Sequence, residues 1–198
     1  SATGQTSAFI AAAALGEQLI YTLFNSPTHT LMGPLDTLSF GADLGLSGGA
    51  WGFAANYLTI SGLDSVLNGG LDANGAPIAW QTGNNDVHNV IYPLLNGSAQ
   101  GVRDVFDDFG LTINGTAGND EFDGYAAADI FVSNGGADRV NNFASIDQLD
   151  ITGLGFADAN DAIASAYLDG LGNTVLDDGA NTITLIGYTG SLSTANFV

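Results

Sequence analysis

The chain has 198 residues, 45% of them hydrophobic, which is enough to bury a core as one large or two small domains. Its 21 acidic residues against 2 basic ones give a formal net charge of −19, and such a surface repels nucleic-acid phosphates and anionic lipid headgroups. The lack of cysteine excludes disulfides and thiolate metal sites, and the lack of an apolar run of about 18 residues argues against membrane insertion.

A low share of charged residues, 12%, together with 28 glycines, indicates a folded, turn-rich and mostly β protein rather than a disordered acidic tail. The sequence opens on Ser1 and has no charged-then-apolar segment of the kind that forms a secretory signal peptide. We therefore expect an N-terminus that has been processed or truncated.

The first part of the chain alternates apolar segments with turn residues. Residues 7–15 (SAFIAAAAL) predict a short helix or a strand edge. Residues 18–24 and 29–41 alternate apolar and polar positions, which predicts two strands separated by the Asn-Ser-Pro turn between them. Residues 55–63 (ANYLTISGL) predict a further strand.

The spacing of apolar residues then changes from that of strands to that of helices. Residues 86–95 predict a helix with Asp86 as its N-cap and with Pro93 as a residue that shortens or kinks it. Residues 98–110 predict a second helix that stops at Gly110. Strands followed by helices predict an α+β fold, in which helices pack on an antiparallel β-sheet.

From residue 115 the sequence repeats every nine residues, as GTAGNDEFD, GYAAADIFV and SNGGADRVN. Each unit carries an aspartate, and these are Asp120, Asp129 and Asp138. The pattern is a degraded, three-turn copy of the β-roll nonapeptide, in which glycines allow tight turns and an apolar residue packs inside. We therefore expect a small, mostly β domain with three buried apolar residues, namely Phe122, Phe131 and Val140.

Carboxylate oxygen is the ligand that a hard cation such as calcium prefers. Because successive turns of a β-roll alternate sides, Asp120 and Asp138 are expected on one side, and one calcium between them is the most that this repeat supports. In the alternative interpretation the array is too short and too degraded to bind metal and is retained only as packed turns. The sequence leaves both interpretations open.

The repeats and the segment after them resemble the C-terminal region of RTX-type proteins exported by type I secretion. Residues 141–156 are similar to the segment that follows the repeats in that group, and residues 173–198 resemble its paired terminal strands and uncleaved export signal. The resemblance divides the chain into a first domain, 1–114, and a secretion domain, 115–198. It implies an extracellular or cell-surface protein that leaves a Gram-negative bacterium without an N-terminal signal peptide.

The first domain resembles the HasA-type hemophores, which are secreted haem scavengers that also leave the cell by type I export. Residues 19–44 (LIYTLFNSPTHTLMGPLDTLSFGADL) are similar to that family's second haem-binding loop and the strands after it. Residues 85–114 are similar to its closing pair of helices. The resemblance implies haem as the cofactor and an outer-membrane haem receptor as a partner.

Carried over by position, the resemblance makes Tyr21 the ligand of the haem iron and His29 the histidine that hydrogen-bonds its phenolate oxygen. A free tyrosine, with a pKa of about 10, is a poor ligand at neutral pH, and a histidine that takes or shares the phenol proton favours the anion that ferric iron prefers. In the family a histidine on an earlier loop holds the other side of the haem. No residue of this sequence matches it, and His88 matches no ligand position.

Two other interpretations compete with haem binding. Tyr21 and His29 are also explained as a strand tyrosine and a turn histidine that pack for structural reasons. A surface-layer, matrix or filament subunit built on the hemophore fold would share the acidity and the Gly-rich β content, and would assemble with copies of itself through exposed strand edges. No enzyme is expected, because the sequence lacks a P-loop, an H-E-x-x-H motif and a supported Ser-His-Asp order.

Overall fold

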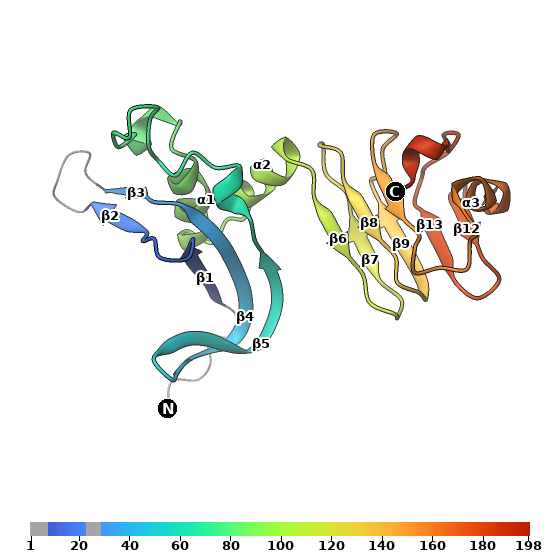
Figure 1. The fold of residues 1–198 in the computed structure, drawn as a ribbon, viewed down its shortest axis with the longest axis horizontal. Coiled ribbons are helices and arrows are strands. Elements are labelled where there is room, and N and C mark those ends of the chain that lie inside the picture. The colour runs from blue at the N-terminus through green and yellow to red at the C-terminus, as the bar shows by residue number, and fades with distance from the viewer. Residues whose placement is uncertain (1–7, 23–28) are drawn as a thin grey trace. The chain divides into compact units, whose positions relative to one another are not determined.

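The structure is a computed structural model that describes residues 8–22 and 29–198 (Figure 1). It forms two compact parts, unit 1 (residues 1–102) and unit 2 (residues 103–198). This division falls within helix α2 (Gln100–Asp108), earlier in the chain than the domain boundary predicted at residue 114.

The main sheet of unit 1 is antiparallel and has the strand order β1-β4-β5. Its strands are β1 (Ala8–Ala13), β4 (Leu35–Ser47) and β5 (Ala50–Ile60). The chain turns from β4 to β5 at Gly48 and Gly49, whose φ angles of 61° and 85° suit glycine and match the twist of a tight hairpin. Of the two alternatives for residues 7–15, the structure shows the edge strand. The strand predicted over 55–63 corresponds to the second half of the longer β5, which ends at Ile60, three residues earlier than predicted.

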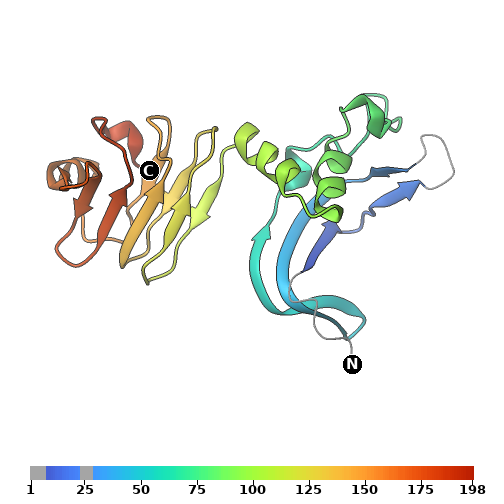
Figure 2. The ribbon, with the colours of Figure 1, turned by 180° about the vertical axis from the view of Figure 1, so that it is seen from behind.

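Strands β2 (Ile20–Thr22) and β3 (Thr30–Met32) form a separate two-stranded antiparallel ribbon in unit 1 (Figures 1 and 2). The prediction of one continuous strand over 29–41 is wrong, because the chain breaks between β3 and β4 at Gly33. This glycine has a φ of 120°, and a Cβ there would collide with the backbone carbonyl of Gln18. The predicted Asn-Ser-Pro turn lies outside the described residues.

The N-cap of helix α1 (Asp86–Leu95) is Asn85, so the prediction that Asp86 caps this helix is wrong. The side chain of Asn85 accepts a hydrogen bond from the backbone N–H of His88 at 2.9 Å. The carboxylate of Asp86 instead accepts a hydrogen bond from the backbone N–H of Asn68, also at 2.9 Å. Asn85, the residue just before the first helical turn, therefore supplies the oxygen that accepts a free N–H of that turn.

Helix α1 continues through Pro93 to its end at Leu95, and α2 lies inside the range predicted for the second helix. The apolar stripe of α1 is buried, and it consists of Val87, Val90 and Ile91. Leu35 and Leu38 of β4 are also buried, with exposed fractions of 0% and 1%. Unit 1 thus has a core to which both the helix and the long strand contribute.

The repeats of unit 2 form a coil of short parallel strands (Figures 1 and 2). One parallel sheet contains β6 (Thr112–Asn114), β8 (Ile130–Val132) and β10 (Gln148–Asp150). The other pairs β7 (Glu121–Asp123) with β9 (Ala137–Asn141). Successive strands alternate between the two sheets, as a nine-residue β-roll repeat predicts.

The second sheet of unit 2 continues beyond the repeats. β13 (Thr182–Leu185) pairs in parallel with β9, and the antiparallel strands β12 (Thr174–Asp177) and β11 (Tyr167–Leu168) follow. Helix α3 (Ala159–Ser165) begins at its N-cap, Asp158. The short 3-10 helices of the chain are η1 (Leu63–Ser65), η2 (Trp80–Thr82) and η3 (Thr194–Asn196).

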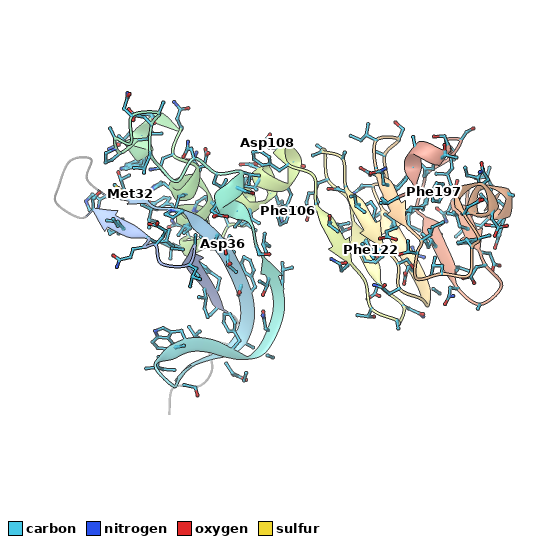
Figure 3. All side chains as sticks on the ribbon, viewed as in Figure 1. Met32, Asp36, Phe106, Asp108, Phe122 and Phe197 are labelled. Atoms are coloured by element: carbon cyan, nitrogen blue, oxygen red, sulfur yellow. The ribbon has the colours of Figure 1, made fainter. Side chains whose placement is uncertain are left out.

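The apolar residues of the repeat point inward. Phe122, Phe131 and Val140 have exposed fractions of 5%, 1% and 0%, which confirms that they pack inside the coil. Figure 3 shows Phe122 among the strands of the coil and Phe197 near the C-terminus, and both belong to the same buried cluster. A Cβ at Gly115 would lie 2.8 Å from the ring of Phe122, so the first repeat needs glycine there to accommodate its own phenyl ring.

An antiparallel sheet with helices in unit 1 and a mostly β unit 2 confirm the predicted α+β class. In the described part of the chain, no helix has both the length and the apolar character needed to cross a bilayer.

His88 is buried on α1 beside two aromatic rings. Its exposed fraction is 5%, and its ring stacks on Trp80 and Tyr92 with centroid distances of 5.5 and 5.0 Å. Within the described residues, no hydrogen-bond partner reaches its Nδ1. Burial lowers the pKa of His88 below its ordinary value of 6.5, because the charged imidazolium loses its hydration.

We expect unit 1 to lose stability as the pH falls below about 6.5, because the unfolded chain takes up a proton at His88 that the folded chain disfavours. The change His88→Phe keeps a ring in the stack and is expected to flatten this dependence between about pH 6.5 and pH 5. Denaturant unfolding at several pH values, followed by the fluorescence of Trp51 and Trp80, measures the effect. His29→Asn, at the exposed histidine, is the control, and equal slopes for wild type and His88→Phe would contradict the prediction.

Candidate functional site

The structure brings Tyr21 and His29 together at the β2-β3 ribbon of unit 1. The phenolic oxygen of Tyr21 lies 3.0 Å from Nδ1 of His29, a hydrogen-bonding distance. The two ring centroids are 6.2 Å apart, and the side chain of Tyr21 is 52% exposed. The phenolic oxygen is therefore tied to an imidazole at the protein surface rather than packed into the core.

The backbone positions both partners of this bond. Tyr21 lies opposite Leu31 in the ribbon register, and His29 occupies the turn residue just before β3. His29 has a φ of 53°, in the left-handed region that non-glycine residues seldom occupy. Such a conformation persists where the surrounding structure imposes it, and here it accompanies the approach of the imidazole to the phenol.

The chemistry of the pair is that of a proton shared between oxygen and nitrogen. The phenol donates to Nδ1 when the imidazole carries its own proton on Nε2. If the proton passes to Nδ1, the imidazolium donates back to a phenolate oxygen. The arrangement can therefore offer an anionic oxygen to a metal while the proton stays inside the hydrogen bond.

Asn85 anchors β3, and the sequence analysis missed this role. Its side-chain NH2 donates to the carbonyl of Leu31 at 2.8 Å and to that of Ile78 at 2.9 Å, while its oxygen caps α1. The side chain is fully buried, and a Cβ at Gly70 would approach its amide within 2.8 Å. An asparagine directly before a helical apolar pattern is a recognisable cap signal, but its two carbonyl partners follow only from the fold.

Asp120 and Asp138 also lie together, on one side of the coil, where Oδ1 of Asp138 accepts the backbone N–H of Asp120 at 2.9 Å. The contact joins a carboxylate to an amide rather than two carboxylates to a common cation. Across the described residues, no group of three or more histidine, cysteine, aspartate or glutamate side chains is placed to hold a metal. The predicted calcium site between Asp120 and Asp138 therefore has no support in the geometry.

Asp147 is a further member of the aspartate register that the sequence analysis missed. It lies nine residues after Asp138, and it is fully buried. Burial raises its pKa, while hydrogen bonds from the backbone of Asp129 and Ala144 act in the opposite direction. Extending the nine-residue period by one unit would have found it.

Comparison with known proteins identifies the family. Residues 1–166 match the family described as Heme-binding protein A (HasA). Hemophore HasA of Serratia marcescens is 40% identical over 132 residues, which cover 65% of this chain and 61% of that protein. Holo and apo structures of hemophore HasA from Yersinia pestis are 25% and 27% identical, with TM-scores of 0.41 and 0.40, and in both cases 52% of this chain and 54% of theirs are covered.

The description of the matched family defines a class of haem-binding proteins. The chain belongs to the HasA family, which confirms the resemblance of its first domain to the HasA-type hemophores. The match runs past residue 114 into the repeats, and the chain spans less than two thirds of the length of the HasA proteins it matches. The family agrees with the expectation of a protein that is not an enzyme.

The buried contacts of Asn85 generate a stability prediction. Asn85→Asp keeps an oxygen to cap α1 but turns the second oxygen toward the carbonyls of Leu31 and Ile78. We expect unit 1 to lose about 2 kcal/mol or more, because two donated hydrogen bonds are lost and a buried charge is left unpaired. Denaturant unfolding monitored by tryptophan fluorescence measures the loss.

The matched control is Asn96→Asp at the other end of the same helix. Asn96 is exposed and donates to the carbonyl of Tyr92 at 2.8 Å, so the same chemical change there should cost less than about 1 kcal/mol. Similar losses for the two variants would show that Asn85 is not a buried anchor.

Proposed function

We propose that this protein binds haem, with the phenolic oxygen of Tyr21 as ligand of the iron and with His29 as the group that holds the phenol proton. The observation that carries the proposal is the 3.0 Å hydrogen bond between the Tyr21 oxygen and Nδ1 of His29, made by a tyrosine that is half exposed. Membership in a family described as heme-binding supports it, as does 40% identity to a hemophore.

The residues present would hold a haem through one oxygen ligand to its iron, that of Tyr21. When bound, the haem would supply a ferric iron, which favours an anionic oxygen ligand. Tyr21 would offer that oxygen at the surface, and Nδ1 of His29 lies within hydrogen-bonding distance to accept the phenol proton.

The electrostatics of unit 1 give no assistance to an anionic ligand. The sequence contains no lysine, and its first arginine is Arg103. Propionate groups would therefore meet hydroxyls and backbone N–H groups rather than cations. Affinity in this proposal comes from iron coordination and apolar contact, and it should rise with salt, which screens the repulsion between the acidic protein and the propionates.

We also propose the wider setting of the hemophore: an extracellular protein, exported by the type I route from a Gram-negative bacterium, that passes haem to an outer-membrane receptor. The sequence resemblance of residues 115–198 to type I secretion regions supports the route, and the hemophore relative supports the role. The absence of cysteine is compatible with either side of the membrane.

A hemin titration tests the ligand assignment. In the wild type we expect a Soret shift together with a charge-transfer band from phenolate to iron. Tyr21→Phe should abolish the charge-transfer band and weaken binding by at least about tenfold, because the phenyl ring offers no ligand oxygen. His29→Ala should weaken binding less than Tyr21→Phe does, because the ligand oxygen remains and only its hydrogen-bond partner is lost.

Tyr92→Phe is the matched control, since Tyr92 on α1 is 53% exposed and Tyr21 is 52% exposed. It should leave the spectrum and the affinity unchanged. A hemin spectrum that is the same in wild type and in Tyr21→Phe would remove Tyr21 as the ligand and with it this proposal.

A further inference from the structure

The aspartates of the coil use their oxygens inside the protein. Oδ1 of Asp129 accepts the backbone N–H of Leu111 at 2.8 Å, and its Oδ2 accepts that of Tyr125 at 2.7 Å. Asp147 repeats the arrangement one full turn later, with the N–H groups of Asp129 at 3.0 Å and Ala144 at 2.7 Å. In each case one bond reaches back 18 residues and the other closes the local turn.

The other side of the coil follows the same rule. Oδ1 of Asp138 accepts the N–H of Asp120, 18 residues back, and its Oδ2 accepts the hydroxyl of Ser133 at 2.6 Å. Asp120 closes its own turn by accepting both the N–H and the hydroxyl of Thr116 on Oδ2, at 2.7 and 3.0 Å. We call these contacts, from Asp120, Asp129, Asp138 and Asp147, the amide–carboxylate ladder.

This donor set does not fit calcium. Calcium takes six to eight oxygen ligands, and a β-roll supplies them from carboxylates and carbonyls that face one another across neighbouring turns. Here the exposed fractions of Asp129, Asp138 and Asp147 are 0%, 1% and 0%, and both oxygens of each already accept a hydrogen bond from an N–H or O–H group. A cation would have to displace these donors and leave buried N–H groups unpaired.

We propose that the amide–carboxylate ladder takes the place of bound calcium, so that the β-roll of unit 2 folds at any calcium concentration. In Asp129, Asp138 and Asp147, one carboxylate oxygen joins its own turn to the turn 18 residues earlier in the chain. A cation bound between those two turns would make the same connection. Hydrogen bonds to a carboxylate are about twice as strong as neutral ones, so the ladder is adequate for this purpose. The degraded repeat is then a metal-free form of the roll rather than a weakened calcium site.

Hydrogen exchange and thermal unfolding of the full chain test the proposal. Samples with EGTA, with calcium, and with magnesium at equal ionic strength are compared, because any cation screens a net charge of −19. The backbone amides of Leu111, Asp120 and Asp129 should be equally protected in all three, with equal melting temperatures. Protection or a rise in melting temperature that calcium produces and magnesium does not would overturn the proposal.

Two variants separate the ladder from a metal site. Asp129→Asn presents one oxygen and one NH2 group to two backbone N–H donors, so one of the two hydrogen bonds is lost. The melting temperature of unit 2 should therefore fall by roughly 4–8 °C, with or without calcium. Asp120→Asn keeps an oxygen for Thr116 and should change the melting temperature by less than about 3 °C. If Asp129→Asn is neutral, or if Asp120→Asn removes a calcium response, the ladder is not the stabilising element.

Discussion

The buried side chain of Asn85 is the contact on which the candidate site depends. It joins the first turn of α1, the carbonyl of Leu31 in β3 and the carbonyl of Ile78, so three segments share one polar group. A two-stranded ribbon is marginally stable alone. Because Leu31 pairs with Tyr21 across the ribbon, the position of the phenol is set by the packing of a helix more than 60 residues later in the chain.

Unit 2 also contains buried polar side chains that make hydrogen bonds to several segments, and here they recur at a fixed spacing. Buried polar groups are tolerated when each donor and acceptor has a partner, and the carboxylates of Asp129, Asp138 and Asp147 satisfy that condition with backbone and hydroxyl donors. The cost of the ladder is the desolvation of buried carboxylates: burial raises the pKa of Asp147, and the nearby charge of Asp129 adds to this effect.

The sequence predicted the features that depend on the spacing of residues along the chain and on the chemistry of residues close together in it. Helical spacing located α1 and α2, the nine-residue repeat placed Phe122, Phe131 and Val140 inside, and the loop motif paired Tyr21 with His29. It did not predict what depends on neighbours far along the chain. The break at Gly33 follows from the carbonyl of Gln18, and the true cap and anchor, Asn85, is recognised by its distant carbonyl partners. The aspartates suggested calcium because their side chains favour cations, while the donors that occupy them are mostly backbone amides, which have no sequence signature.

Charge decides what kind of ligand pair such a protein can use. A net charge of −19, with no lysine and no arginine before Arg103, means that a lone phenolate or carboxylate ligand would add repulsion toward an anionic haem. A phenol that passes its proton to His29 avoids this, because phenolate and imidazolium together remain neutral. In the proposed haem complex the proton would move within the 3.0 Å hydrogen bond between the Tyr21 oxygen and Nδ1 of His29. His29 would then let an acidic surface present an anionic oxygen without raising its own charge.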